Sequence, residues 1–404
     1  MASFDGTSKA SAATVESTAR NIRYCEKTSP YLEKVKAKAI ANASPEAIAY
    51  CNTENYSGPA VAVDAATLTE DEWLARRSSC VGGSDCSAVF GDNKYKDNLR
   101  LYYEKIGQVP VTTEKETGKR AKLWGHISEE YVAACLQDRY PGNEVFVDTN
   151  IYTHPDHPFI SANVDRMMKR PDGSYVLVEI KTSGPFIATK EVWGDDDNPN
   201  VPIPYLYQVR QYMAILGVWE CVIACMFERD NVIYRSVIRD LDEEMRIVSG
   251  VTSFWEDNVL ARIPPKPCGN PSTILTTIGA YTGKANIQLP SFELASQEYA
   301  SQCQEYLRLD RLKSQAKKEF DRATELCDAA KIPFVQALGQ TVDAVCESLD
   351  GKRNYIVRYS ARRGRRTISD WDAFEREAPS LYNKYVTRGE AESRVFTMKE
   401  ITKK

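Results

Sequence analysis

The sequence predicts an α/β protein with a core of mixed β-sheet flanked by helices, followed by a helical arm and a basic β element. Between about residues 66 and 265, β-rich runs alternate with segments of helical periodicity. A proline-rich break at 263–267 ends this pattern, and a long amphipathic segment follows it. We therefore divide the chain into an N-terminal extension at 1–65, a core at 66–265 and a C-terminal region at 266–404.

The composition is that of a globular protein without a global basic field. The chain has 404 residues, 43% of them hydrophobic, and a formal net charge of −4. Nucleic-acid binding stays open, because phosphate contacts need only a local basic stripe. Eleven cysteines form no C-x-x-C pair and only three histidines occur, so we expect an intracellular protein with reduced core cysteines and no zinc or histidine-based site. No apolar run approaches the length of a membrane span.

The N-terminal extension is predicted to be partly disordered and partly helical. Its first twenty residues are rich in Ala, Ser and Thr and lack the apolar core of a signal peptide, which favours a disordered tail. Short helices are expected at 31–43 and 45–52, before a Ser-Gly-Pro break at 57–59. The core then opens at 69–73, where a threonine and three acidic residues indicate a helix start.

The next segment combines an arginine, a glycine pair and a serine. Gly82 and Gly83 directly precede Ser84, and Arg77 lies seven residues before that serine. Glycines let backbone N–H groups approach an anion, and arginine offers a planar fork, so the segment suits phosphate. The alternative is an ordinary turn in which Arg77 pairs with a nearby carboxylate such as Asp85.

A predicted helix then follows Trp124-Gly125. Glu129 lies at the edge of its apolar face, beside Leu136, and Glu130 points nearly opposite. We therefore expect Glu129 to lean toward the core and a metal, and Glu130 to be solvated.

The most informative stretch is a predicted β-hairpin. Residues 160–165 and 176–181 are β-rich runs on either side of a Pro-Asp-Gly turn at 171–173. If the turn centres on Asp172, position 165 pairs with 179 and position 163 with 181. Side chains two apart on a strand share a face, so four polar side chains converge there. They are Asn163, Asp165, Glu179 and Lys181.

This convergence favours a metal-dependent phosphodiesterase site, for which Asp…Glu-x-Lys is typical. Two carboxylates and an ammonium crowded together destabilise a fold unless a cation or substrate binds there. The alternative is a surface hairpin with an ordinary salt bridge. The apolar residues in between, Val164, Val178 and Ile180, favour the first interpretation, because they indicate a strand buried on its other face.

After the hairpin, the sequence predicts a helix at 205–216, ended by Gly217, and paired strands at 220–227 and 232–238. Gln208 flanks the buried stripe of that helix, and its amide can accept and donate hydrogen bonds at once. Without other context, an exposed helical glutamine is an equal alternative.

The C-terminal region combines a long helix with a basic segment. Apolar residues recur at spacings of three and four from 299 to 330, which predicts an amphipathic arm able to pack as a coiled coil. Between 352 and 366 there are seven Lys and Arg residues and no acid. We expect this segment to lie on a DNA backbone or, alternatively, to form a solvated charged hairpin. Its candidate contacts are Arg358, Arg362, Arg363, Arg365 and Arg366.

In this order, the motifs resemble the YqaJ-type viral recombinase family, the phage lambda exonuclease-like branch of the PD-(D/E)XK nucleases. The resemblance covers roughly residues 73–227 and depends on joint occurrence. The motifs are Trp73-x3-Arg77-x6-Ser84, Trp124-Gly125-x3-Glu129, Asp165…Glu179-Ile180-Lys181 and Tyr205-x2-Gln208-Val209. The arginine cluster and Pro379-x2-Tyr382-x2-Tyr385 resemble the C-terminal region of longer members. One difference is Asn163-Val164-Asp165, where the family often has Ser-Pro-Asp.

The resemblance implies a PD-(D/E)XK core and a metal site. Asp165, Glu179 and the Ile180 carbonyl would coordinate Mg²⁺, for which Mn²⁺ can substitute. Glu129 would hold the metal or its water.

It also implies roles for the residues around the metal. Lys181 would orient and help deprotonate the attacking water, with Gln208 positioning it. Arg77 and Ser84 would hold the terminal 5′-phosphate, and Asn163 would donate to phosphate.

The sequence therefore predicts a Mg²⁺-dependent deoxyribonuclease, a 5′→3′ exonuclease on duplex DNA ends that exposes 3′ single strands for recombination. Expected partners are DNA ends and a single-strand annealing protein, with a homo-oligomer left open and no membrane. The expected location is the cytoplasm of a bacterial host if a phage encodes the chain, with the nucleus or an organelle as alternatives. The functional alternatives are an endonuclease or resolvase of the same fold and a non-catalytic DNA-binding protein.

Overall fold

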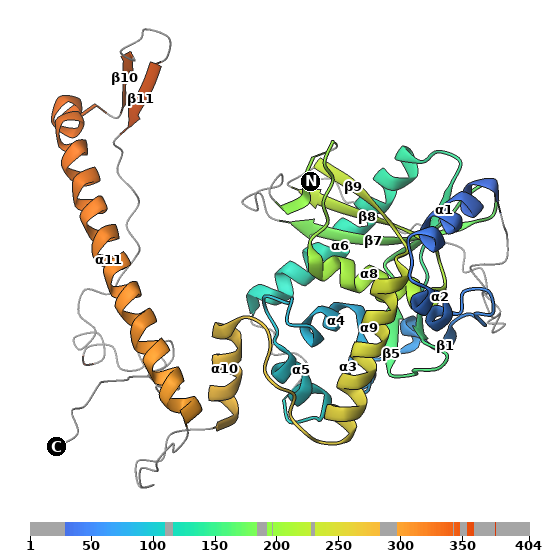
Figure 1. Cartoon of the computed structure of the whole chain (residues 1–404). Helices are drawn as coiled ribbons and strands as arrows, with labels where there is room; N and C mark the ends of the chain where they lie inside the picture. The colour runs from blue at the N-terminus through green and yellow to red at the C-terminus, as the bar shows by residue number, and fades with distance from the viewer. Residues whose placement is uncertain are drawn as a thin grey trace. The chain divides into compact units, whose positions relative to one another are not determined.

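The computed structural model describes residues 29–109, 116–183, 192–195, 197–227, 231–282, 297–341, 343–347, 354–358 and 376. The chain divides into two compact units, residues 1–281 and 282–404. The first unit contains the α/β core and the second contains the long arm (Figure 1).

The first unit is built on two mixed β-sheets. A four-stranded sheet has the order β1-β4-β5-β2, and a five-stranded sheet has the order β3-β6-β7-β8-β9. Each contains one parallel pair, β2 with β5 and β7 with β8. The strands are β1 (Ala60–Asp64), β2 (Val81–Gly82), β3 (Glu144–Phe146), β4 (Asn150–Thr153), β5 (Ile160–Asn163), β6 (Arg166–Lys169), β7 (Tyr175–Ser183), β8 (Glu220–Phe227) and β9 (Asn231–Ile238). The predicted α/β fold with mixed sheet is confirmed.

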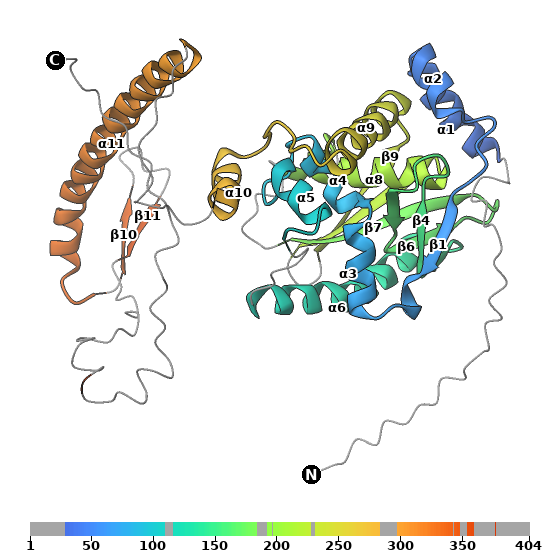
Figure 2. The ribbon, with the colours of Figure 1, turned by 90° about the horizontal axis from the view of Figure 1, so that it is seen from below.

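Helices cover both faces of the five-stranded sheet, as Figure 2 shows for α6 and α8. Val132 and Leu136 of α6 pack with alternate residues of β7 and β8 on one face, and Val209 and Met213 of α8 pack on the other. Burial on both faces explains why β8 is almost continuously apolar. The described α-helices of this unit are α1 (Pro30–Ala41), α2 (Pro45–Cys51), α3 (Glu70–Ser78), α4 (Gly83–Val89), α5 (Asn98–Lys105), α6 (Glu116–Arg139), α8 (Ile203–Leu216), α9 (Leu241–Ser253) and α10 (Pro271–Thr282).

Short-range signals located several helix ends correctly. Thr69 caps α3 and shares a capping box with Glu72, in which the backbone N of Thr69 donates to the carboxylate at 2.9 Å. Gly217 ends α8 in the left-handed region, at φ +68°. Three predicted helices and two predicted strands are confirmed, namely α1, α2, α8, β8 and β9. Each of these predictions depends on periodicity and end signals that lie close together in sequence.

The predicted hairpin is present, but its first strand is divided between the two sheets. Strand β6 pairs with β7 in the expected register, with Arg166 opposite Val178, and Gly173 turns the chain at φ +86°. Residues 160–163 instead form β5, which pairs with β4 and β2 in the other sheet. The assignment of 160–163 to the hairpin was therefore wrong. Turn chemistry reports only neighbouring residues, whereas the partners of β5 come from elsewhere in the chain.

The described segment before residue 65 joins the core, which the sequence did not predict. Strand β1 extends the four-stranded sheet by pairing with β4. Leu32 and Val35 of α1 pack on Trp219, and Ala47 of α2 packs on Leu241 at the start of α9. Small apolar clusters thus hold both helices against the core.

The second unit contains, in its described residues, a long helix and a β-hairpin. The helix α11 (Gln297–Leu338) confirms the predicted arm, and β10 (Asp343–Glu347) pairs with β11 (Asn354–Arg358). Arg358 ends β11. The Pro379–Tyr385 motif lies outside the described residues. So do the other basic candidates, Arg362, Arg363, Arg365 and Arg366.

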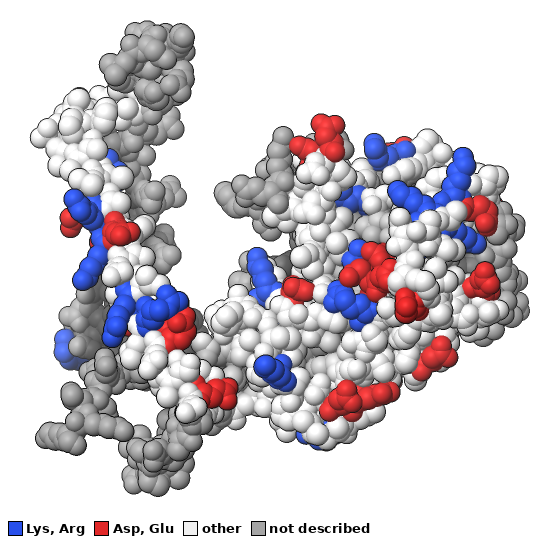
Figure 3. Space-filling model, in the orientation of Figure 1, with Lys and Arg blue, Asp and Glu red and all other residues white. Residues whose placement is uncertain are grey.

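The surface charges and most of the cysteines are distributed as the composition led us to expect. On the face that Figure 3 shows, acidic and basic side chains are intermixed over the first unit. The nine described cysteines are free, as expected, but Cys327 is exposed on α11 and is not a core residue. No helix in the described ranges is long and apolar enough to cross a membrane.

Candidate active site

A cavity of about 250 Å³ in the first unit brings together every candidate residue predicted in the core. Its walls come from α3, α4, α6, α8, β5 and β7. The candidates that line it are Arg77, Ser84, Glu129, Asn163, Asp165, Glu179, Ile180, Lys181 and Gln208. Segments more than a hundred residues apart in sequence therefore meet at one site.

Strand β7 and the link before β6 position the acidic residues. Glu179 and Lys181 share one face of β7, while Ile180 belongs to the apolar cluster on the opposite face. Asp165 lies in the short link between β5 and β6. Its Oδ2 accepts a hydrogen bond of 2.8 Å from the backbone N of Ile180, so β7 fixes the orientation of this carboxylate.

Glu179 is buried, with 1% of its surface exposed, and only one of its carboxylate oxygens has a partner. Oε1 accepts hydrogen bonds from Lys181 Nζ and, at 2.6 Å, from Gln208 Nε2. Oε2 is buried and has no hydrogen-bond partner. Burial raises the pKa of Glu179 to about 8, aided by the charges of Asp165 and Glu129 and opposed by Lys181. A bound cation would satisfy this otherwise costly oxygen.

Lys181 is held as a cation. Besides Glu179, its Nζ donates to Gln208 Oε1 at 3.1 Å and lies 5.1 Å from the centre of the Tyr205 ring. Burial lowers the pKa of Lys181, but the charges of Glu179 and Asp165 outweigh burial and raise that pKa above its ordinary value. Lys181 is therefore suited to donate to a water or a phosphate oxygen, and is a poor proton acceptor while both carboxylates are charged.

Gln208 uses both ends of its amide inside the protein. Its Nε2 donates to Glu179 and, at 3.3 Å, to Tyr212 Oη, while its Oε1 accepts from Lys181. The amide thus holds the Glu179–Lys181 pair in place, and its Oε1 keeps a second lone pair that could accept a hydrogen bond from a water. The sequence analysis missed Tyr212, although its spacing of four residues from Gln208 on one helix could have indicated it.

Glu129 and Glu130 differ in the way the sequence predicted. Glu129 is partly buried and lines the cavity, whereas the side chain of Glu130 is 76% exposed. Glu130 nevertheless accepts a hydrogen bond of 2.5 Å from Arg166, whose other terminal nitrogen donates to the Asp165 carbonyl at 2.7 Å. This connection was not predicted.

The opposite end of the cavity contains the phosphate candidates. The NH2 nitrogen of Arg77 donates to Ser84 Oγ at 3.3 Å and lies 3.6 Å from Asp85 Oδ1. The guanidinium is 5.0 Å from the centre of the Trp73 ring. The predicted grouping with Ser84 and the alternative pairing with Asp85 are thus both present in one side chain.

Asn163 and Gly83 also lie at this cavity, and the structure shows what surrounds each of them. Asn163 is exposed at the end of β5, where it lines the cavity without belonging to the hairpin. Gly83 is required by packing, because a Cβ there would lie 2.4 Å from Tyr212 Cε1. Gly83 therefore lets α8 approach, and the approach of an anion to the backbone N–H groups of the glycine pair stays a prediction.

The donor set near Glu179 fits a small divalent cation held by few protein ligands. Among the described residues, no three His, Cys, Asp or Glu side chains are grouped closely enough to hold a metal ion. Asp165 and Glu179 Oε2 offer two carboxylate ligands, and Mg²⁺ commonly binds through one or two carboxylates and keeps several waters. Glu129 lines the same cavity, and its role toward the metal or its water, like that of the Ile180 carbonyl, stays a prediction.

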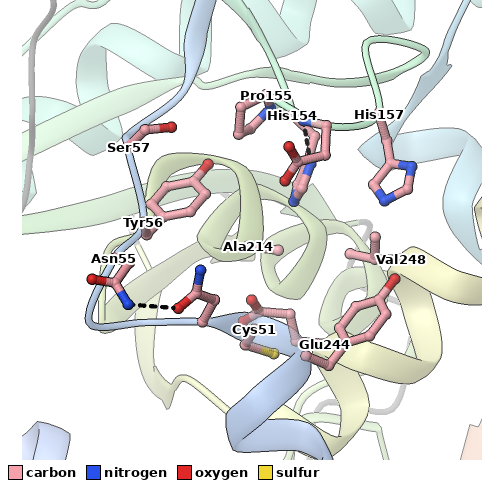
Figure 4. Close-up of a pocket in the computed structure, with 13 residues that line it drawn as sticks. Cys51, Asn55, Tyr56, Ser57, His154, Pro155, His157, Ala214, Glu244 and Val248 are labelled. Carbon is pink, nitrogen blue, oxygen red and sulfur yellow. Dashed lines mark hydrogen bonds between the residues drawn. The ribbon is translucent and has the colours of Figure 1, made fainter.

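A second polar cavity, also of about 250 Å³, lies between α2, the β4–β5 turn and α9 and contains no predicted residue. His154 and His157 of the turn line it (Figure 4). Glu244, on its opposite side, accepts two hydrogen bonds of 2.6 Å from Arg239. Burial, followed by the charge of His157, lowers the pKa of His154 to about 4. The unpartnered carboxylate oxygen of Glu179 has no counterpart in this second cavity.

The chain is similar to one domain family and to several known proteins. Residues 72–218 match the YqaJ-like viral recombinase domain. The protein YqaJ of Bacillus subtilis (strain 168) is 30% identical over 257 residues, which are 62% of this chain and 76% of that protein. An alkaline exonuclease structure from Laribacter hongkongensis covers 48% of this chain and 94% of its own, with 19% identity and a TM-score of 0.38. A phage-related exonuclease structure from Haemophilus somnus 129PT covers 45% and 96%, with 13% identity and a TM-score of 0.32.

Proposed function

The chain belongs to the YqaJ-like viral recombinase family, and from this premise we propose that it is a metal-dependent deoxyribonuclease that acts from DNA ends. One observation carries the proposal. The buried, unpartnered Oε2 of Glu179 lies in the same cavity as Asp165 and Lys181, and that cavity also contains Arg77. Two carboxylates and an ammonium suit phosphodiester hydrolysis, and an arginine suits phosphate.

Asp165 and Glu179 would hold the metal, Mg²⁺ with Mn²⁺ as a substitute, since both ions prefer oxygen ligands. When bound, such an ion polarises a phosphodiester and lowers the pKa of a water molecule. The hydrogen bond from Ile180 N orients Asp165 in advance, which reduces the reorganisation that binding requires. Glu129, which lines the same cavity, would hold the metal or its water.

Lys181 would position the attacking water and stabilise negative charge on the phosphate. Its contacts with Glu179 and Gln208 restrict its position before substrate arrives. It would take up a proton only when the charge of Glu179 and Asp165 is compensated, because those charges raise its pKa.

Arg77 and Ser84 would bind the terminal 5′-phosphate, which makes the enzyme a 5′→3′ exonuclease on duplex ends. A terminal phosphate carries more charge than a diester and suits the planar guanidinium. Removal of the 5′-ended strand exposes a 3′ single strand, so a single-strand annealing protein is the proposed partner, in the cytoplasm of a bacterial host. The basic segment from Arg358 to Arg366, with Asn163 at the cavity, would add contacts to phosphate.

The test is digestion of end-labelled linear duplex, with and without a 5′-phosphate, beside a covalently closed circle. We expect digestion of the linear duplex with Mg²⁺, none in EDTA, faster rates on phosphorylated ends, and no cutting of the circle. Arg77→Ala should lose rate selectively on phosphorylated ends. Rapid cutting of the circle would replace this proposal with an endonuclease or resolvase of the same fold. DNA binding without cutting in any metal would favour a non-catalytic binding protein.

A further inference from the structure

We propose that Asp85, Lys96 and Lys105 form a buried ionic scaffold that positions Arg77 for the terminal phosphate. This inference rests on the proposed function and concerns residues that do not line the cavity themselves. They would act through Arg77, as positioning residues, and not through contact with DNA.

The scaffold holds Arg77 at both its backbone and its guanidinium. Lys105 Nζ donates to the backbone carbonyl of Arg77 at 2.7 Å and to Asp85 Oδ2 at 2.8 Å. The other oxygen of Asp85 lies 3.6 Å from Arg77 NH2 and accepts a hydrogen bond of 2.9 Å from Lys96. Trp73 lies beside the guanidinium, so that the arginine is held from three directions.

Asp85 and Lys105, at the centre of the scaffold, are almost completely withdrawn from water. Asp85 is 2% exposed, and the side chain of Lys105 has no exposed surface at all. Burial would raise the pKa of Asp85, but Lys105, Lys96 and Arg77 together hold it well below its ordinary value. Buried ion pairs contribute little net stability compared with apolar packing of the same volume, so stability alone gives weak grounds for this arrangement. A role in orienting Arg77 gives stronger grounds for it.

Glu104 extends the network along α5. It pairs with both Lys96, at 2.7 Å, and Arg100, at 2.8 Å. Lys96 therefore bridges two buried carboxylates, Asp85 and Glu104, which restricts its own position and that of Asp85.

Lys105 and Lys96 provide a matched pair of test positions. Both donate to Asp85 at nearly the same distance, 2.8 and 2.9 Å, but only Lys105 also binds the Arg77 carbonyl. Lys105→Met should lower the ratio of digestion rates on 5′-phosphate and 5′-hydroxyl ends at least fivefold, and Lys96→Met should lower it clearly less. In the Arg77→Ala background, Lys105→Met should leave the ratio unchanged, because the residue that it positions is gone.

A binding measurement separates this inference from the proposed chemistry. The affinities of the full chain for 5′-phosphorylated and 5′-hydroxyl duplex should be compared in EDTA, where no digestion is expected. Lys105→Met should reduce the preference for the phosphorylated end, with melting temperatures recorded for every variant. If Lys105→Met does not fold, Asp85→Asn, which keeps the shape of the side chain, has to reduce the same preference.

The outcomes are distinct. Loss of preference in Arg77→Ala together with full preference in a folded Lys105→Met would overturn the scaffold and leave the proposed nuclease intact. A loss of rate in Lys105→Met that is equal on 5′-phosphate and 5′-hydroxyl ends, with their ratio unchanged, would overturn the scaffold and leave the network as general structural support. Absence of digestion with any metal would overturn the proposed function, while a preference for phosphorylated ends in binding would still support the scaffold.

Discussion

Two buried carboxylates, Glu179 in the wall of the cavity and Asp85 behind Arg77 at its other end, have opposite properties. Glu179 and Asp85 are 1% and 2% exposed, so both lose the hydration of their charge to a similar extent. Asp85 meets three cations and its pKa is depressed, whereas Glu179 meets one cation and two acids and its pKa is raised. Both oxygens of Asp85 are paired, while Oε2 of Glu179 is not.

This difference indicates which end is complete in the protein alone. Asp85 needs no ligand, because its neighbours already compensate its charge, so its contribution is to fix the position of Arg77. Glu179 is unfavourable as it stands, and an added positive charge would satisfy it. Burial alone therefore does not distinguish the two carboxylates, whereas the number and sign of the neighbouring charges do.

The largest expected effect concerns the end of the cavity that contains Glu179, where we propose that a metal binds. Asp165→Ala, Glu179→Ala and Lys181→Ala should each lower the rate of duplex digestion at least about a hundredfold, roughly 2.7 kcal/mol in the barrier. Each removes a group that would bind the metal or position the attacking water. The measurement is the initial rate on phosphorylated linear duplex with Mg²⁺. A Lys181→Ala variant that digests at the wild-type rate would remove this end of the cavity from the chemistry.

Opposite effects on stability would sharpen the comparison. In EDTA, Asp85→Asn should destabilise the protein by about 3–5 kcal/mol, because it leaves buried lysines without their counter-charge. Glu179→Gln should stabilise the metal-free protein by about 1–3 kcal/mol, because it replaces a poorly compensated buried charge with a neutral amide. Urea unfolding at pH 8 measures both changes. Changes of the same sign would contradict the distinction between the two ends.

The two carboxylates should also act in different pH ranges. The folded pKa of Glu179 lies above its ordinary value of 4.5, so its contribution to stability is fully present below about pH 4.5 and is lost as pH rises toward 8. The folded pKa of Asp85 lies below its ordinary value of 3.8, so its contribution is present above that pH and is lost in stronger acid. Each slope is limited to about 1.4 kcal/mol per pH unit per proton. Unfolding curves in EDTA should show that Glu179→Gln removes only the first dependence.

A smaller effect is expected from the two glutamates of α6. Glu129→Gln should lower the digestion rate about tenfold, because Glu129 lines the cavity, and Glu130→Gln should change it less than twofold. Both variants are assayed side by side with Mg²⁺. A larger loss at Glu130 would indicate that its hydrogen bond to Arg166 controls the position of Asp165 more than the sequence suggested.

The smallest effect on chemistry is expected outside the first unit. Replacing Arg362, Arg363, Arg365 and Arg366 with Ala should weaken DNA binding while leaving the digestion rate at saturating DNA nearly unchanged. The slope of log K against log[salt] should become shallower by about 0.9 for each phosphate that the protein no longer neutralises. An unchanged slope would favour a solvated surface segment. Arg77→Ala serves as the comparison, since it should alter the preference for phosphorylated ends.

Much of the site could be predicted because its signals are local. The Pro-Asp-Gly turn and the alternation along β7 define the β6–β7 register, which places Glu179 and Lys181 on one face next to Asp165. Helical periodicity likewise separates Glu129 from Glu130 on α6. Such signals depend on residues within a few positions of one another, and backbone geometry translates them directly into direction.

The partners of these residues could not be predicted in the same way. The sequence assigned 160–163 to the hairpin, but β4 and β2 compete for that strand and bring it into another sheet. It could not show that Tyr212 approaches Gly83 so closely that a Cβ there would lie 2.4 Å from its ring. The sequence also did not predict that the Gln208 amide binds Glu179, Lys181 and Tyr212, while its expected role in positioning a water stays a prediction.

By itself, the sequence determined which residue types are present, where the main secondary elements begin and end, and that two acids and a lysine share a strand face. Only the tertiary structure decided that Asp85 meets three cations while Glu179 keeps an unpartnered oxygen. The physical reason is that the energy of a buried charge depends on every charge and dipole within several ångströms. Those neighbours come from α3, α5, α6, β7 and α8, which only the folded chain brings together.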